Sequence, residues 1–338
     1  MAEDKFTAAG HPIDAVILWV DGNDPVLAAK RDLYLVKESK TASHPGALPL
    51  RFASSGEIRY CLFSILTFAP FIRNIYIVTD GQNPGLGTET EKLFPGRSAS
   101  VKIVDHKEIF RGYEQYLPSF NSSSILSLIW RIEGLSDNFV YFNDDFFLIR
   151  DIRPEDWVLN GRPVLRGEWR LPPFRILLGN RLKTFVNRKL RRNSSYLPKI
   201  SFYIRQWQTA KLTGNRGRYF FHCHIPYPMN RVLLEDYFSD NRELLEENIS
   251  YRFRSREQFL LTSLAWHLEI QAGNRQLQKL NHGYFHPYYS DRRLMRRLAR
   301  CVRDTRIRSI CVQSIEVLSQ PLREKLLSFM DSVLNLKV

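Results

Sequence analysis

Two adjacent carboxylic acids interrupt an apolar and aromatic stretch, VYFNDDFFLI, at residues 140–149. Asn143, Asp144 and Asp145 stand in a run that would otherwise be typical of a buried strand. Burying an unpaired carboxylate is costly, so these side chains need a cation, a basic partner or a position at the water-filled end of the strand. Neighbouring carboxylates suit Mg²⁺ or Mn²⁺, which prefer oxygen ligands. The structural alternative is a solvent-facing turn.

Four other stretches carry residue types suited to proton or phosphate chemistry. They are WVDGNDP with Asp21, VKIVDHKEIF with Asp105 and His106, HCHIPYP with His224, and RFRS with Arg252 and Arg254. A carboxylate or an imidazole can take a proton from a hydroxyl, and paired arginines bind phosphate. Each stretch also has an ordinary alternative, as a turn, a helix cap or a solvated basic face. HCHIPYP is a poor zinc site, because no second His or Cys cluster lies at a suitable spacing.

Most of these polar groups directly follow an apolar run in the first half of the chain. The runs predict strands at 15–20, within 74–84, within 101–110 and at 139–149, separated by helices at 26–40, 57–68 and 121–133. Asn121 or Ser122 caps the last of these helices. Alternating strands and helices predict a doubly wound α/β sheet, in which ligands bind beyond the carboxyl ends of the strands. Those ends supply Asp21, Asp80, Asp105, His106 and the residues 143–145.

The second half has a different character. Residues 160–220 are rich in Arg, Pro and Gly with weak periodicity, which predicts a loop-rich insertion. Helices are expected at 231–248, 256–272 and 320–335. The stretch 291–308 is a predicted basic amphipathic helix, with eight arginines around an apolar stripe formed by Leu294, Met295, Leu298 and Val302.

The composition indicates an anionic partner. The 338 residues carry a net charge of +14, which suits a phosphorylated or nucleotide-linked substrate, a membrane surface or nucleic acid. The four cysteines are scattered and the first residues lack the apolar core of a signal peptide, so we expect a cytoplasmic protein. No apolar run reaches about 18 residues, the length a membrane span needs. The Walker A, dinucleotide-binding and G-x-S-x-G signatures are also missing from the sequence.

Taken together, these motifs resemble the Stealth family of bacterial capsular and exopolysaccharide hexose-1-phosphate transferases, which is related to the N-acetylglucosamine-1-phosphotransferase of animals. The four regions that carry the resemblance are IDAVILWVDGNDP (13–25), the stretch from RFASSG to FNDDFFL (51–148), the stretch from FHCHIPYP to YRFRSREQF (221–259) and RIRSICVQSIE (306–316). The resemblance implies transfer of a sugar-1-phosphate from a nucleotide sugar, usually a UDP-sugar, to a hydroxyl of a glycan or lipid-linked oligosaccharide, with release of UMP.

The resemblance also implies roles for individual residues. Asp144 and Asp145 would hold Mg²⁺ or Mn²⁺, and Arg254 with Arg59 would bind the diphosphate. His224 is the first choice for the general base, and Asp21 and His106 are the other candidates. Asn121 and Asn143 are further substrate-binding candidates from the motifs, and Arg252 is one because it lies on the same side of an extended segment as Arg254.

The expected fold is a Rossmann-like, glycosyltransferase-A-like α/β core at 1–155. An Arg/Pro-rich insertion at 156–220 follows, and a mostly helical part at 221–338 would complete the site. We expect the 291–308 helix to contact anionic lipid headgroups on the inner face of the membrane, and we expect no nucleic-acid partner.

The sequence departs from the family pattern at four positions, and the two in the fourth region put that region's part in the site in question. Leu126 stands where an acid is common, Trp130 where a His is frequent, and Gln313 and Ser314 where the pattern reads Asn-Asp. Two other functions remain open. One is a metal-dependent glycosyltransferase that releases UDP, and the other is a basic protein that binds membrane or nucleic acid without catalysis.

Overall fold

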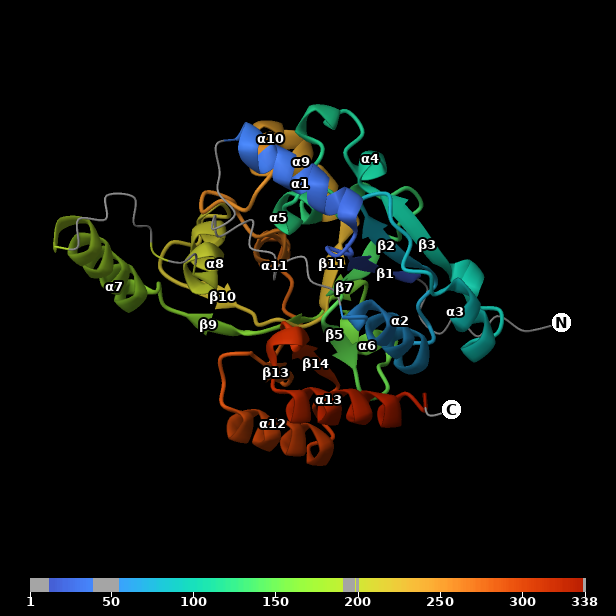
Figure 1. The fold of residues 1–338 in the computed structure, drawn as a ribbon. Helices are drawn as coiled ribbons and strands as arrows, with labels where there is room; N and C mark the ends of the chain where they lie inside the picture. Colours follow the sequence, from blue (N-terminus) through green and yellow to red (C-terminus); the bar gives the residue numbers. More distant parts are fainter. Residues whose placement is uncertain (1–11, 39–54, 191–197, 199–200, 337–338) are drawn as a thin grey trace.

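The first half of the chain alternates buried strands with helices and builds a five-stranded central sheet (Figure 1). The computed structural model describes residues 12–38, 55–190, 198 and 201–336. The strand order is β11-β4-β1-β2-β3, with β1 to β4 mutually parallel and β11 antiparallel at one edge. The strands are β1 (Ile13–Leu18), β2 (Ile75–Thr79), β3 (Val101–Asp105), β4 (Asn138–Asn143) and β11 (Tyr227–Asn230).

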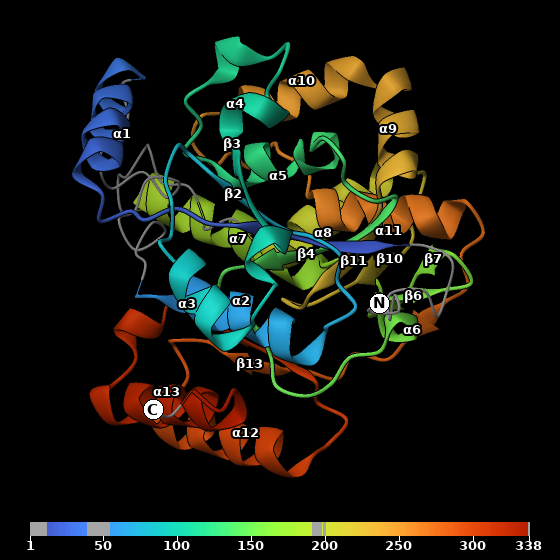
Figure 2. The ribbon, with the colours of Figure 1, turned by 90° about the vertical axis from the view of Figure 1, so that its right-hand side faces the viewer.

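Helices cover both faces of this sheet. Figure 2 shows α2 and α3 on one side and α4, α5, α9 and α10 on the other. Covering both faces explains why β1, β2 and β4 are almost entirely buried and why their sequences are continuous apolar runs. These covering helices are α2 (Glu57–Phe68), α3 (Gly87–Leu93), α4 (His106–Ile109), α5 (Ser122–Leu126), α9 (Arg231–Asp240) and α10 (Arg242–Ser250). The predicted α/β fold is confirmed.

A second, three-stranded sheet packs beside the first and joins the two halves of the chain. It consists of β5 (Phe146–Leu148), β13 (Gly283–Phe285) and β14 (Ser309–Val312), in the order β13-β14-β5. Strand β14 runs antiparallel to β5, with Cys311 opposite Phe146. The fourth region of the sequence motif therefore pairs directly with the strand that follows the two aspartates.

The remaining elements fill the second half and the edges of the molecule. The helices are α1 (Pro25–Lys37), α6 (Pro154–Trp157), α7 (Phe174–Phe185), α8 (Phe202–Lys211), α11 (Leu261–Gln271), α12 (Asp291–Arg303) and α13 (Gln320–Val333). The short strands are β6 (Val158–Leu159), β7 (Arg162–Pro163), β8 (Leu165–Arg166), β9 (Glu168–Arg170), β10 (Tyr219–Phe221) and β12 (Leu277–Gln278).

Several predicted elements differ from the structure. The stretch 139–149 is not one strand, because the chain turns at Asp144 and Asp145 and passes from the central sheet to the second sheet. The helix predicted at 121–133 is the short α5, capped by Asn121, followed by a 3-10 turn at Ile129–Arg131. The region 160–220 was expected to be loop-rich, yet it contains α7 and α8. The predicted division at 155 and 220 stays a prediction, although β11 and β14 of the last part pair with strands of the first.

The basic helix α12 uses its apolar side to pack against the protein. Leu294, Leu298 and Cys301 are buried, and α12 packs on β13 and α13. Val302, which was assigned to the apolar stripe, is instead 53% exposed. The buried stripe repeats at four and then three residues, the spacing of one helix face, and Val302 lies one position beyond it. Its arginines remain at the surface, but its apolar face is not available to another partner.

Candidate functional site

The turn that carries Asp144 and Asp145 lies where the strand order of the central sheet reverses. From β1 the chain proceeds outward through β2 and β3, and β4 then returns to the opposite side of β1. Ligands of open α/β sheets bind at such a switch point, outside the carboxyl ends of the strands. Asn143 ends β4 at this edge, and the two half-buried aspartates follow it.

The second sheet holds the aspartate turn from the other side. The backbone N–H of Val312 donates to the carbonyl oxygen of Asp145 at 3.0 Å. The thiol of Cys311 donates to Asp145 Oδ2 at 3.6 Å, a long contact even for sulfur. The other carboxylate oxygen, Oδ1, is buried and has no hydrogen-bond partner in the part of the chain that the structure describes. Strand β14 therefore fixes the turn and leaves one oxygen of Asp145 unsatisfied.

Both aspartates resist ionisation in this environment. Burial raises the pKa of Asp145 to about 7, with a further contribution from the nearby Glu57. Burial also raises the pKa of Asp144 well above its usual value, and the charges of Asp145 and Glu57 add to this. Glu57, at the start of α2, is itself 7% exposed and has a raised pKa because of burial. Three acids thus share one poorly solvated region, which favours a cation there.

These residues fit a hard divalent cation that is completed by a ligand. The unsatisfied Asp145 Oδ1 and the mutual repulsion of the acids are what a bound Mg²⁺ or Mn²⁺ would relieve. Among the described residues, no group of three or more His, Cys, Asp or Glu side chains is arranged to hold a metal. Magnesium is commonly held by one or two carboxylates together with substrate phosphates, so two protein ligands are sufficient.

His224 follows β10 and lies between two aromatic rings. Its ring stacks on Phe202 at 4.7 Å and on Tyr284 at 5.4 Å between centroids. Burial lowers the pKa of His224 to about 4, and the positive charge of Arg254 contributes to this shift. His224 is therefore neutral near pH 7 and can accept a proton. The guanidinium of Arg254 donates through Nη2 to Ser122 Oγ at 2.5 Å, at the first residue of α5.

His224 and the aspartate turn are joined through Tyr284. The ring of Tyr284 in β13 stacks on His224, and its hydroxyl donates to Gln313 Oε1 at 2.7 Å. Burial raises the pKa of Tyr284, and the charges of Cys311 and Asp145 contribute. The structure thus brings the turn, His224 and Arg254 into one neighbourhood, built from β4, β13, β14, the segment after β10 and the segment before α11.

Asn143 is engaged in contacts that shape this neighbourhood. Its side-chain oxygen accepts a hydrogen bond from the hydroxyl of Tyr141, and its backbone oxygen accepts one from the thiol of Cys61 at 3.6 Å. Tyr141 in turn stacks on Tyr227 of β11 at 5.9 Å. Asn143 is thereby fixed at the carboxyl end of β4, beside the aspartates.

Asp21 lies at the end of the neighbouring strand β1 but is part of a turn. Its Oδ1 accepts a hydrogen bond from the backbone N–H of Asn23 at 2.9 Å. The side chain of Gln82 bridges to the backbone N–H and carbonyl of Asp21 at 2.9 and 3.0 Å, and also reaches Asp24. Asp24 caps α1. The motif WVDGNDP therefore forms a turn and a helix cap, which is the structural alternative given for it above. Asp21 nevertheless lies at the edge of the sheet where the parallel strands have their carboxyl ends.

His106 belongs to a separate polar cluster. It is 2% exposed at the start of α4, and its Nδ1 lies 3.8 Å from Asp80 Oδ1. Asp80 is paired with Lys30 at 2.8 Å. Burial lowers the pKa of His106 to about 4, even though Asp80 opposes this. Because β3 is three strands from β4, the spacing of strands places His106 roughly 14 Å from Asn143 across the sheet.

The other predicted substrate-binding residues make structural contacts. Arg59 pairs with Glu89 of α3 at 2.6 Å, so Glu57 and not Arg59 faces the aspartates from α2. Asn121 is buried, caps α5 and donates to Tyr251 O and Gln258 Oε1 at 2.8 and 2.9 Å. Arg252 donates to the carbonyl of Gln115 at 2.8 Å and lies over the ring of Tyr34.

The sequence motifs missed Glu57, Tyr284 and Cys311 as members of this site. Glu57 and Cys311 lie inside the motif regions, and this is the only sequence feature that could have pointed to them. Tyr284 lies outside those regions. Of the four residues that depart from the family pattern, Leu126 is buried and Trp130 stacks on Phe238 at 5.9 Å between ring centroids. Gln313 accepts from Tyr284, and Ser314 adopts a left-handed conformation with φ 51°. The fourth region thus supports the site through its backbone and Cys311.

Known proteins share these regions. A model of Stealth conserved region 1 matches residues 11–37, and one of conserved region 2 matches residues 51–163. An exopolysaccharide phosphotransferase of Streptomyces coelicolor is 44% identical over 151 residues, which cover 43% of this chain and 25% of that protein. A capsular polysaccharide phosphotransferase of Streptococcus thermophilus is 37% identical over 153 residues, covering 45% of this chain and 60% of that protein.

A longer match comes from an exopolysaccharide phosphotransferase of Lactiplantibacillus plantarum. It is 31% identical over 264 residues, covering 74% of this chain and 73% of that protein. The chain spans between a quarter and three fifths of the length of several other relatives. Among solved structures, a galactosyltransferase LgtC with donor and acceptor sugar analogues has a TM-score of 0.41 at 10% identity, covering 94% of this chain and 95% of that one. Mouse xyloside xylosyltransferase 1 has a TM-score of 0.40 at 12% identity, covering 89% and 97%. The sequence matches place the chain in the Stealth family.

Proposed function

We propose that the chain transfers a sugar-1-phosphate from a nucleotide sugar to a glycan hydroxyl. The observation that carries this proposal is the aspartate turn at the switch point of the sheet, with neutral His224 and cationic Arg254 in the same neighbourhood. Transfer of a phosphoryl group between two oxygens requires positive charge around that group and a base for the attacking hydroxyl. The carboxylates would hold a cation, Arg254 would add a second positive charge, and His224 would be the base. Relatives named as capsular and exopolysaccharide phosphotransferases support the same reaction class.

The proposed step exchanges one phosphorus–oxygen bond for another. The acceptor hydroxyl oxygen attacks the phosphorus that bears the sugar, and the bond from that phosphorus to the bridging oxygen breaks. His224 takes the hydroxyl proton, and the nucleoside monophosphate leaves with the bridging oxygen. The negative donor would raise the low pKa of His224 toward the working pH, and Arg254 would bind the phosphoryl oxygens.

The donor would be a UDP-sugar lying across the carboxyl ends of β4 and β1. Asp144 and Asp145 would hold Mg²⁺ or Mn²⁺, which supplies positive charge for the diphosphate. Asn143 fixes this end of β4, and Asp21 borders it from β1. Asp21 stays the second candidate for the base. His106 stays the third, although its cluster with Asp80 and Lys30 lies farther along the edge. Arg59, Asn121 and Arg252 would contribute by supporting the walls of the site.

The products decide between this proposal and its alternatives. Incubation with candidate UDP-sugars and an exopolysaccharide acceptor should give a phosphodiester signal in ³¹P NMR together with UMP. Release of UDP with no phosphorus in the glycan would show the glycosyltransferase instead. The double variant Asp144→Asn, Asp145→Asn should form no product. If neither product forms but the protein binds nucleic acid in a salt-sensitive way, the non-catalytic alternative is correct.

The acceptor and the place of action remain predictions. We propose a glycan or lipid-linked oligosaccharide acceptor and contact with an anionic membrane surface on its cytoplasmic side. None of the described helices combines the length and apolar character needed to cross a membrane.

A further inference from the structure

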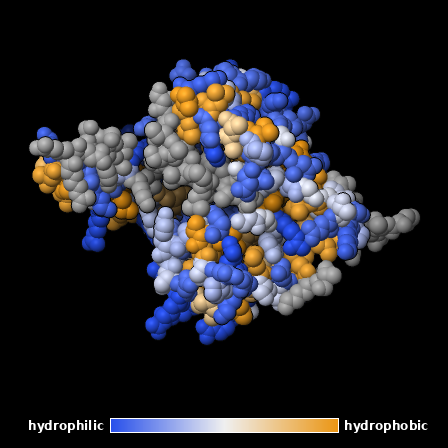
Figure 3. Space-filling model, viewed as in Figure 1, coloured by the Kyte–Doolittle hydropathy of each residue, from blue (hydrophilic) through white to orange (hydrophobic). Residues whose placement is uncertain are grey.

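Helix α7 projects from the body of the protein and exposes one apolar face. Figure 1 shows it at the far left of the molecule, and none of its residues is buried. Leu178 is 69% exposed and Leu182 is 62% exposed. Leu171, Phe174 and Phe185 are also more than half exposed. Hydrophobic residues reach the surface at this end of the molecule in Figure 3, next to hydrophilic ones.

Four of these apolar side chains, Phe174, Leu178, Leu182 and Phe185, share one face of α7, because they follow each other at spacings of four, four and three residues. Leu171 lies just before the helix, three residues ahead of Phe174. Single exposed leucines are common on protein surfaces, but a continuous apolar stripe marks an interaction surface. Helix α12 has a similar spacing, but its stripe is covered by β13 and α13.

The charge around this stripe is of one sign. Residues 171–190 contain five basic residues and no acidic one, and the basic residues are Arg175, Arg181, Lys183, Arg188 and Lys189. An apolar stripe with basic residues beside it is the pattern of a helix that lies in the headgroup layer of an anionic membrane. Long basic side chains can cover apolar groups with their stems while their charges reach phosphates.

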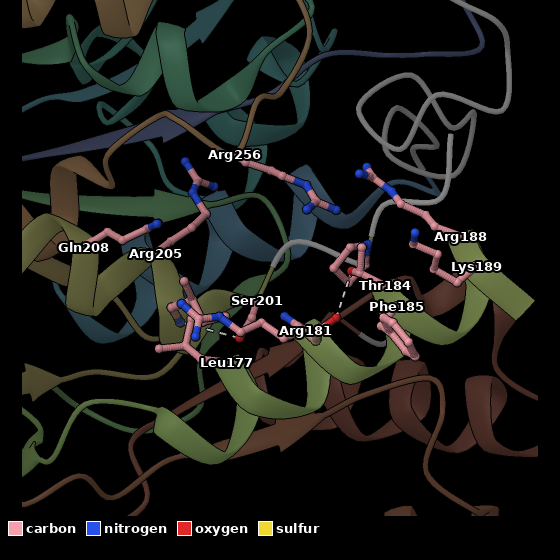
Figure 4. A pocket seen from close by; sticks show the side chains of 13 residues that line it. Leu177, Arg181, Thr184, Phe185, Arg188, Lys189, Ser201, Arg205, Gln208 and Arg256 are labelled. Atoms are coloured by element: carbon pink, nitrogen blue, oxygen red, sulfur yellow. Dashed lines mark hydrogen bonds between the residues drawn. The ribbon is translucent and has the colours of Figure 1, made fainter. Parts of the chain in front are cut away.

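The cavity behind α7 has the same character. Its volume is about 610 Å³, and it lies between α7, α8 and the segment at residue 256. Arg181, Arg188 and Lys189 line it from one side, and Arg205 and Arg256 line it from the other (Figure 4). Its described lining contains no Asp or Glu. The positive potential of α7 therefore continues into the interior, where a headgroup phosphate would be attracted.

We propose that α7 docks the protein on an anionic phospholipid bilayer, with its apolar stripe in the headgroup layer. The proposal assigns the membrane contact to α7 instead of α12, and it rests on the membrane contact proposed above but not on the transfer reaction. An anionic bilayer fits both observations at once, because it offers apolar depth for the stripe and negative charge for the basic residues.

Helix α8 connects this docking surface to the candidate catalytic residue. Phe174 of α7 packs edge to face against Trp207 of α8, with 6.3 Å between ring centroids. Phe202 at the start of α8 stacks on His224. Docking through α7 would therefore hold the side of the protein that carries His224 near the bilayer surface, within reach of an acceptor anchored in lipid.

Vesicle flotation tests the proposal without any activity measurement. We expect the full chain to float at low salt with vesicles of phosphatidylcholine mixed with phosphatidylglycerol, and not with phosphatidylcholine alone. Leu178→Ser with Leu182→Ser should lower the partition coefficient about tenfold or more, because the apolar stripe is interrupted. Arg175→Gln with Lys183→Gln should also weaken binding. Raising the salt from about 0.01 M to about 1 M should release the protein.

Matched changes on α12 serve as controls. Arg292→Gln with Arg296→Gln removes the same charge from exposed positions of that helix, and Val302→Ser replaces an exposed apolar side chain. Neither should reduce vesicle binding to the extent of the α7 changes. Circular dichroism and the midpoint of thermal unfolding should be unchanged in all variants, since every substituted residue is exposed.

Three outcomes would overturn the proposal. The first is that the wild type does not bind the mixed vesicles at low salt. The second is that the α7 variants bind like the wild type while the α12 variants do not. The third is that gel filtration shows the wild type to self-associate through α7, with vesicle binding absent and self-association lost in the Leu178→Ser, Leu182→Ser variant.

Discussion

Asp144 and Asp145 are adjacent acids whose surroundings favour their neutral forms. Burial is the main cause, and the negative charge of Glu57 adds to it. When folding raises the pKa of an acid, the protein loses stability as the pH rises from the pKa of that acid in the unfolded chain to its higher pKa in the folded protein. The pair therefore reduces the stability of the protein near neutral pH, a cost that is expected of residues kept for function.

Replacing these acids should separate activity from stability. Asp144→Asn or Asp145→Asn should lower kcat by about 10²-fold or more, because the proposed cation would lose a charged ligand. At pH 8 the free energy of unfolding should rise by about 1 kcal/mol, because a poorly solvated charge is removed. Steady-state kinetics and urea unfolding measure the two effects. Asp151→Asn, an exposed acid six residues further along the chain from Asp145, is the control and should change neither. Full activity in either site variant would rule out the cation role.

His222 and His224 are two residues apart but differ in their surroundings. His222 is fully buried against Tyr227 and Trp266, and burial lowers its pKa to about 3. The pKa of His222 is near 6.5 in the unfolded chain and about 3 in the folded protein. The contribution of His222 to stability is therefore fully present above pH 6.5. This stability is lost as the pH falls toward 3.

The pH dependence of stability should show the lowered pKa of His222. In wild type, protonation of His222 in the unfolded chain should cost about 2 kcal/mol of stability between pH 7.5 and pH 5. His222→Gln should be less stable at pH 7.5, and its deficit relative to wild type should shrink at pH 5. Urea unfolding at both values measures this. A deficit that stays constant would show that His222 titrates normally in the fold. His224→Gln should instead reduce kcat with little change in stability at pH 7.5.

At the scale of elements, the second sheet places the catalytic candidates relative to each other. β5 follows the aspartate turn, β14 pairs with β5, and β13 pairs with β14 and carries Tyr284. Tyr284 stacks on His224 through its ring and donates to Gln313 through its hydroxyl. The ring and the hydroxyl thus have separable roles, the first in positioning His224 and the second in fixing β13 to the segment after β14.

Two substitutions of Tyr284 should separate those roles. Tyr284→Phe keeps the ring and should cost about 1 kcal/mol of stability, with kcat nearly unchanged. Tyr284→Ala removes the stacking partner and should lower kcat about tenfold or more, because His224 loses its fixed orientation. Kinetics and thermal unfolding of both variants provide the test, with Tyr288→Ala, at a 78% exposed position, as the control. Equal kcat values for the Phe and Ala variants would show that stacking does not position His224.

At the scale of the whole molecule, the site is assembled by two distant parts of the chain. The acids come from residues 57, 144 and 145, whereas His224, Arg254, Tyr284 and Cys311 come from the second half. The described residues offer two aspartates for a metal and no larger ligand group. A cation and a nucleotide should therefore depend on each other for binding.

Thermal unfolding with combined ligands should show this dependence. Mg²⁺ alone or UDP alone should shift the unfolding midpoint little, whereas both together at about 100 times their Kd should raise it by a few degrees. EDTA should reverse the combined shift. The Asp144→Asn, Asp145→Asn variant should not respond to the combination. A full shift with UDP in the presence of EDTA would show that nucleotide binding does not need a metal.

The sequence by itself determined the local elements and the identity of the motifs. Continuous apolar runs followed by polar turns predicted β1, β2 and β3, and the amphipathic repeat predicted α2 with its bounds. These features depend on residues close together in the chain, so local patterns are sufficient to predict them. The aspartates were recognised for the same reason, because two acids inside an apolar run conflict with burial.

Only the tertiary structure decided which of these residues meet. It divided VYFNDDFFLI between two sheets, paired the fourth region with β5, and placed Glu57 instead of Arg59 near the acids. It also covered the apolar stripe of α12 and left that of α7 exposed. Strand order, pairing across sheets and the covering of a helix face depend on contacts between distant segments. A local sequence pattern does not contain information about such contacts. It therefore cannot distinguish an apolar stripe that is buried in the fold from one that is exposed.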